Sequence, residues 1–142
     1  MQAARPSRLR LSGAIHHVAL RGHDGQVLFG CDADHAALDD IVGALLRESA
    51  ARVHAYCWMS NHLHLVVEIP PGLMAAWQDE LIRRYSRHRQ RDPVAGVPLF
   101  APADPAFRVD ADAYLLQLIR YVHLNPLRAG LVRDAADYHW SG

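Results

Sequence analysis

The sequence contains no lysine, although fifteen of its 142 residues are basic. Every permanently positive side chain is therefore an arginine, and fifteen acidic residues bring the formal net charge to zero. Proteins that bind polyanions through their overall field carry a large positive charge, so the composition gives no global sign of nucleic-acid binding. Any polyanionic partner must be held by local clusters of arginine.

Cysteine is also scarce, and long apolar runs are absent. Cys31 and Cys57 can form at most one disulfide, and a chain of this length builds a core without it, so we expect reduced thiols in a cytosolic protein. No apolar run approaches the roughly 18 residues of a membrane span, and the N-terminus has no long signal-peptide core. The sequence thus predicts one cytoplasmic domain over residues 1–142, with no membrane partner.

The spacing of apolar residues and of turn-forming residues predicts a mixed α and β fold. The order β-α-β-β-α-β indicates an α+β, ferredoxin-like (RRM-like) antiparallel sheet with helices packed on one face. A last helix follows and is expected to be interrupted at Asn125-Pro126, because proline disfavours a helical residue before it, with one more helical turn at Arg128–Val132. The predicted elements are strands at Gly13–Arg21, Arg52–Trp58, Leu63–Ile69 and near Leu99 or Phe107, and helices starting at Asp32 or Asp34, spanning Leu73–Arg89 and running from Asp110 or Asp112 to about Leu124.

Two histidines lie two residues apart at the start of the third predicted strand. Side chains at such spacing leave a strand on the same face, so His62 and His64 can reach one metal ion. Paired imidazoles suit a divalent transition metal and leave open positions for substrate oxygens or water. The alternative is a chance pair, since the chain contains ten histidines.

The last predicted helix carries a polar stripe beside an apolar one. At about 100° per residue, Tyr114, Gln117, Tyr121 and Asn125 fall on one side of the helix. A tyrosine at the rim of a core can act as a nucleophile when a nearby metal polarises the group under attack. The other interpretation is that Tyr114 and Tyr121 are amphipathic residues at the edge of the core.

Four stretches together resemble a known family. The chain is similar to the single-tyrosine HUH transposases of bacterial insertion sequences, and most of all to the REP-associated tyrosine transposases. The pairing of AYCWMSNHLHL with the later YVHLNPLRAGLV is specific, whereas either half alone is not. The stretches that carry the resemblance are His16–Gly22, His54–Glu68, Arg120–Val132 and Asp137–Ser141.

The resemblance implies a role for each matched position. His62 and His64 correspond to the histidine pair that holds Mg²⁺ or Mn²⁺, and Asn125 to the polar residue that completes the metal site. Tyr121 corresponds to the catalytic nucleophile, which agrees with the helical stripe that already groups it with Asn125. Tyr114 lies outside the matched stretches. Residues 97–108 depart from the family pattern, because Phe107-Arg108 has the aromatic residue and the arginine in reverse order.

The implied function is metal-dependent cleavage and transfer of DNA strands. In such enzymes the tyrosine attacks single-stranded DNA near a hairpin and forms a covalent 5′-phosphotyrosine, in transposition or in processing of palindromic repeats. The implied location is the cytoplasm, at the nucleoid. Two alternatives are a domesticated hairpin-binding protein without strand transfer and a metal-dependent hydrolase that uses water. The site could be formed within one chain or shared across a homodimer.

Arginines are concentrated near the end of the second predicted helix and in the N-terminal arm. We expect Arg83, Arg84 and Arg87 of the helix and Arg10 of the arm to contact DNA phosphates, because such clusters do so. The alternative for the helix is a solvated face favoured by the helix dipole. Trp77 and Tyr85 could stack on unpaired bases or belong to the core.

Overall fold

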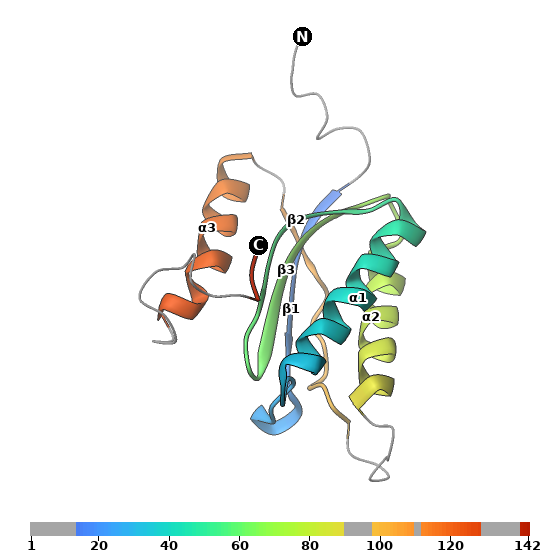
Figure 1. The fold of residues 1–142 in the computed structure, drawn as a ribbon. Coiled ribbons are helices and arrows are strands. Elements are labelled where there is room, and N and C mark those ends of the chain that lie inside the picture. The colour runs from blue at the N-terminus through green and yellow to red at the C-terminus, as the bar shows by residue number, and fades with distance from the viewer. Residues whose placement is uncertain (1–13, 90–97, 110–111, 129–139) are drawn as a thin grey trace.

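A computed structural model describes residues 14–89, 98–109, 112–128 and 140–142 (Figure 1). The strands and helices follow the predicted order. A 3₁₀ turn at His23–Gly25 follows the first strand. In chain order the elements are β1 (Ala14–Arg21), α1 (Asp32–Ser49), β2 (Arg52–Trp58), β3 (His62–Ile69), α2 (Met74–Arg89), β4 (Phe107–Val109) and α3 (Asp112–Arg128).

The strands form one antiparallel sheet in the order β2-β3-β1-β4. The predicted hairpin is present, because β2 pairs with β3 directly across the turn that joins them. The two central strands pair along their whole length, from Ala14 opposite Ile69 to Arg21 opposite His62. This architecture confirms the α+β fold class and the ferredoxin-like element order.

The helices cover both faces of the sheet (Figure 1). The prediction of helices on one face holds for α1 and α2, which pack on the side that presents Leu63, Leu65 and Val67 of β3. In contrast, α3 packs on the other side, where Leu118 contacts the cluster that contains Val66. The cause is β3 itself, whose residues after His62 are all buried, because a strand without an exposed polar face needs cover on both sides.

The helix α3 is longer than the sequence predicts. The prediction that Asn125-Pro126 interrupts it is wrong, since the helix continues to Arg128 with Pro126 inside, and the rest of the turn predicted at Arg128–Val132 lies outside the described residues. Proline removes one helical hydrogen bond and crowds the preceding turn. Here the loss falls near the C-terminal end, and burial of the Pro126 ring offsets part of it. As a result Asn125 stays helical, one turn beyond Tyr121.

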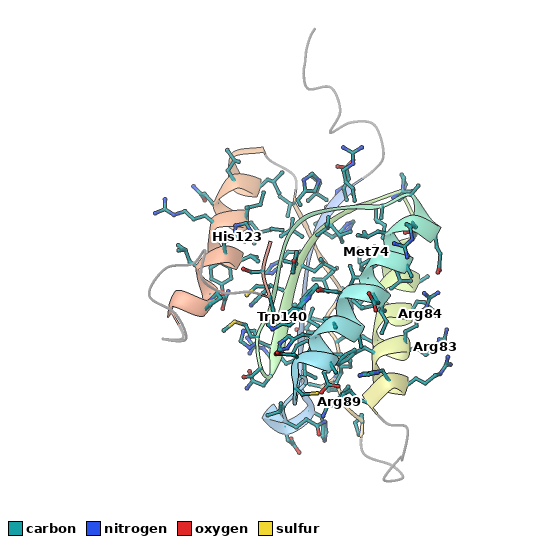
Figure 2. All side chains as sticks on the ribbon, viewed as in Figure 1. Met74, Arg83, Arg84, Arg89, His123 and Trp140 are labelled. Carbon is teal, nitrogen blue, oxygen red and sulfur yellow. The ribbon has the colours of Figure 1, made fainter. Side chains whose placement is uncertain are left out.

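The segment Trp140–Gly142 lies along the outer edge of β2. The amide of Tyr56 donates to the carbonyl of Gly142 at 2.7 Å, and the amide of Gly142 donates back at 3.0 Å. His123 of α3 also reaches this segment, with its Nε2 2.7 Å from the carbonyl oxygen of Gly142 (Figure 2). These contacts cover a sheet edge that would otherwise expose unpaired backbone groups.

Two aromatic residues of α2 belong to the core. Trp77 and Tyr85 are buried among the residues that α1, α2 and the sheet share, and the Tyr85 hydroxyl donates to the carbonyl of Leu28 at 2.6 Å. Of the two interpretations of these rings, stacking on unpaired bases is therefore wrong and packing in the core is confirmed. Across the described ranges, no helix has the length and apolarity that a membrane crossing requires.

Candidate active site

The two histidines of β3 face the side of the sheet that α3 covers. Val66, two residues beyond His64, packs against α3, and the period of two along a strand puts His62, His64 and Val66 on the same face. The imidazole rings of His62 and His64 are nearly perpendicular, with centroids 5.1 Å apart. His64 is buried, with 5% of its surface exposed, whereas His62 is only partly covered.

The helix α3 brings the other two predicted residues to this pair. The Tyr121 ring meets the His64 ring edge to face, with centroids 5.8 Å apart. The side chain of Asn125 forms a hydrogen bond with His62, and its Nδ2 also donates to the carbonyl oxygen of Tyr121 at 3.4 Å. The structure thus brings together all four residues that the sequence analysis assigned to catalysis and metal binding. The side chain of Tyr114 lies outside the described residues.

Both histidines are held through the same ring nitrogen. Nδ1 of His62 donates to Oδ1 of Asn61 at 2.9 Å, and Nδ1 of His64 lies 3.0 Å from Nε2 of His17 on β1. The remaining nitrogen of each ring is Nε2. Histidines that ligate metals are oriented by such a bond at the other ring nitrogen.

Burial keeps these imidazoles neutral. Burial, and to a smaller extent the charge of Arg21, lowers the pKa of His62, although the hydrogen bond with Asn125 opposes this. The pKa of His64 falls to about 3, first because the ring is buried and then because His17, His62 and Arg21 disfavour a further positive charge. Neutral imidazole is the form that binds a metal.

The chemistry of this donor set suits a divalent metal ion. The two neutral imidazoles of His62 and His64 are borderline ligands and the amide oxygen of Asn125 is a hard one, and three ligands leave room for phosphate oxygens and water. Within the described ranges, no group of three or more histidine, cysteine or acidic side chains is arranged to hold a metal. A site here therefore depends on the amide of Asn125.

An open pocket adjoins the site on the same face. It has a volume of about 410 Å³ and is lined by His17, Gln117, Leu118 and Tyr121. Tyr121 is 43% exposed, so the residue is open to solvent beside this pocket. Gln117 belongs to the polar stripe that helical spacing predicts on this helix.

The predicted arginine cluster lies elsewhere. Arg83, Arg84 and Arg87 are on α2, which packs on the face of the sheet opposite α3, and Figure 2 shows Arg83 and Arg84 on the outer side of that helix. Nε of Arg83 donates to Glu80 at 2.9 Å, and Arg84 bridges Glu80 and Glu48 with contacts of 2.8 and 2.7 Å. Arg87 is exposed and has no ion-pair partner among the described residues. Arg10 lies outside the described residues.

Two residues at the site were not singled out from the sequence. His17 bonds to His64, and Arg21 lies opposite His62 in the pairing of β1 with β3. Both alternate with the core residues Val18 and Leu20, so their shared face was visible in the sequence. Their position beside the histidine pair was not, because it depends on the register between two strands that are distant in the chain.

Comparisons with known proteins bear on the fold of this chain and not on its site residues. No family model matches the chain, and no curated protein matches it. Among solved structures, one described as "Structure of the REP associates tyrosine transposase bound to a REP hairpin" aligns over 92% of this chain and 77% of that chain. The TM-score is 0.77 at 14% sequence identity. The chain shares its fold with this transposase.

That likeness confirms the resemblance inferred from the sequence at the level of the fold. The two proteins share the four-stranded antiparallel sheet and its helices, and the alignment covers 92% of this chain. The transposase in that structure is described as bound to a REP hairpin.

Proposed function

We propose that the chain is a metal-dependent endonuclease and strand transferase that cuts single-stranded DNA beside a hairpin through Tyr121. The observation that carries this proposal is the contact between His64 and Tyr121, with Asn125 bonded to His62 beside them. A neutral histidine pair, an amide and an accessible phenol on one face form a site for in-line attack on a phosphodiester.

Each group has a part in the reaction. The Tyr121 oxygen loses its proton and attacks the phosphorus of one phosphodiester, and the bond from phosphorus to the 3′ oxygen breaks. One fragment stays joined to Tyr121 through its 5′ phosphate, and the other leaves with a 3′ hydroxyl after its oxygen takes up a proton. His62, His64 and Asn125 would hold Mg²⁺ or Mn²⁺, and an ion bound there would supply positive charge to polarise the phosphate. One phosphodiester replaces another, so rejoining to a new strand needs no ATP.

Arginine supplies the contacts with the DNA backbone. Arg21 is exposed beside His62 and can hold a phosphate next to the one that is cut. Arg83, Arg84 and Arg87 extend the contacts to α2, on the other face of the sheet. A DNA that touches both regions has to pass around an edge of the sheet. A DNA partner of this kind keeps the protein at the nucleoid.

The contact of His64 with Tyr121 of the same chain supports a site built within one chain. The proposal therefore does not require a homodimer. The hairpin partner is taken from the solved transposase with the same fold and from the arginines of α2. This partner would also fit a protein that binds hairpins without cutting them.

A labelled oligonucleotide separates the three candidate activities. The substrate is a hairpin with a single-stranded flank, labelled at the 5′ end in one sample and at the 3′ end in another, and incubated with Mn²⁺. We expect the 3′ label to migrate with the protein on a denaturing gel, and the 5′ label to appear in a shorter free fragment. Cleavage with no label on the protein would indicate the water-using hydrolase. Hairpin binding without cleavage would indicate the domesticated binding protein.

A further inference from the structure

His17 is joined to the candidate metal site without being one of its predicted ligands. Its Nε2 lies 3.0 Å from Nδ1 of His64, and the two rings are within 21° of parallel, with centroids 5.2 Å apart. The bond connects β1 to β3, the two central strands, which pair over eight consecutive positions. Strand pairing therefore fixes where the His17 ring lies relative to His64.

The hydrogen bonds at the two predicted ligands differ in one respect. A neutral imidazole has one N–H donor and one lone pair. The partner of Nδ1 of His62 is the carbonyl oxygen Oδ1 of Asn61, which can only accept, so His62 carries its proton on Nδ1 and a lone pair on Nε2. The partner of His64 is another imidazole, which can accept or donate. Only if His64 donates to His17 does the lone pair of His64 lie on Nε2.

We propose that His17 is a positioning residue that accepts a hydrogen bond from Nδ1 of His64 and so fixes the tautomer and the ring orientation of the metal-binding histidine. His17 then carries its own proton on Nδ1. This inference rests on the proposed function, because it assigns His17 to the same metal site. It gives His17 and Asn61 equivalent tasks, one for each ligand of the pair.

The packing around His17 supports this role. His17 also lines the pocket beside Gln117 and Tyr121, and it is only partly exposed. Its ring therefore lies on the face of the sheet that α3 covers, with its Nε2 toward His64. His16, the next residue on β1, lines pockets beside Met74 and Ala75 of α2, on the opposite face, and is a matched control.

The tautomer of His64 can be measured without any metal. Long-range correlation of ring protons with ring nitrogens by NMR shows which nitrogen carries the proton. In the metal-free protein we expect His64 to be protonated on Nδ1 and not on Nε2. His17→Phe keeps a ring but removes the acceptor, so His64 should no longer hold that single tautomer. His17→Gln supplies an acceptor oxygen again and should return His64 to the tautomer protonated on Nδ1. His16→Phe should leave the His64 tautomer unchanged.

Binding of Mn²⁺ alone, followed by the loss of the free-ion signal in electron paramagnetic resonance, gives the second measurement. We expect His17→Phe to weaken Mn²⁺ affinity by roughly 10–100-fold, the usual effect of losing a residue that orients a ligand. His17→Gln should recover most of the affinity, and His16→Phe should match the unmodified protein. Circular dichroism of each variant shows whether it is folded.

Three results would overturn the role of His17. The first is a His64 tautomer that is the same in His17→Phe as in the unmodified protein, and the second is an unchanged Mn²⁺ affinity. The third is a loss of binding in both His17→Phe and His17→Gln as complete as in His64→Ala, which would make His17 a direct ligand. If the unmodified protein binds no Mn²⁺ at all, the proposed function itself is contradicted, which is a different result from an altered tautomer.

Discussion

The ring of Tyr121 stands perpendicular to the ring of His64, with the two centroids 5.8 Å apart. The two residues come from α3 and β3, so their contact depends on how the helix packs on the sheet. Leu118 and Val122 of α3 fix that packing, because they are buried against the sheet beside Val66. Substitutions that keep the size of Tyr121 or His64 therefore test chemistry without moving the helix.

The first prediction concerns the histidine pair. His62→Ala and His64→Ala should each abolish DNA cleavage and weaken Mn²⁺ binding, because each removes one of the two imidazoles that face the same point. Circular dichroism should show that the fold persists. Cleavage is measured with the labelled hairpin in Mg²⁺ and in Mn²⁺.

His23→Ala is the control for this prediction. His23 lies in the 3₁₀ turn after β1, where no residue is buried, and the structure gives it no part in the site. The His23→Ala variant should cleave DNA at the rate of the unmodified protein. Normal cleavage by His64→Ala, in either metal, would contradict the metal site.

The second prediction concerns the arginines of α2. Replacing Arg83, Arg84 and Arg87 together by glutamine should weaken hairpin binding and flatten its dependence on salt, because each lost phosphate contact reduces the slope of log K against log salt by about 1. The structure predicts that the three arginines contribute unequally to DNA binding, because they differ in their ion pairs. Arg84 is held by Glu48 and Glu80, so Arg87→Gln alone should reduce the slope more than Arg84→Gln does.

Binding is measured by fluorescence anisotropy with a hairpin oligonucleotide at several salt concentrations. An affinity and a slope that do not change in the triple variant would show that these arginines form a solvated face. A larger effect from Arg84→Gln than from Arg87→Gln would show that DNA displaces the two glutamates from Arg84. The comparison of the single variants thus tells whether these ion pairs survive binding.

The third prediction follows from the carboxylate of Glu80. Hydrogen bonds from Arg83 and Arg84 lower its pKa to about 2, below the value of about 4.3 in an unfolded chain. The folded state therefore binds this proton more weakly than the unfolded state. The resulting stability is fully present above about pH 4.3 and is lost as the pH falls through about 2.

Measuring the free energy of unfolding in urea from about pH 5 to about pH 2 tests whether Glu80 stabilises the fold in this way. Glu80→Gln should be less stable than the unmodified protein at neutral pH, and the difference should shrink as the pH falls from about 5 towards 2. Asp79→Asn is the control, because Asp79 is exposed on the same helix and has no ion-pair partner among the described residues. A difference for Glu80→Gln that stays constant with pH would mean that the ion pairs do not stabilise the fold.

Local patterns in the sequence predicted most of the fold. The two-residue period of the strand predicted that the rings of His62 and His64 lie on one face of the sheet. The helical period predicted that Tyr121 and Asn125 lie on the same side of the helix, one turn apart. The packing of α3 on the face of the sheet opposite α1 and α2 was not predicted. The apolar run after His64 did indicate that β3 needs cover on both faces. Helical spacing shows which side of a helix is apolar, but not which face of the sheet it covers.

The parts of the site that were missed depend on contacts distant in sequence. His17 and Arg21 meet the histidine pair through the register of β1 with β3, which side-chain pattern alone does not specify. The ion pairs of Arg84 depend on the packing of α1 against α2. The continuation of α3 through Pro126 was missed because a local rule about proline was outweighed by burial of its ring.

The last prediction concerns the nucleophile. Tyr121→Phe removes only the hydroxyl oxygen, so the ring contact with His64 and the packing of α3 should persist and stability should change little. Mn²⁺ binding should also persist, because the proposed ligands are His62, His64 and Asn125. The covalent adduct and the cleavage product should both disappear on a denaturing gel. Tyr114→Phe, on the same helix but outside the matched stretches, should form the adduct normally. An adduct that persists in Tyr121→Phe and disappears in Tyr114→Phe would instead place the nucleophile two turns earlier on α3.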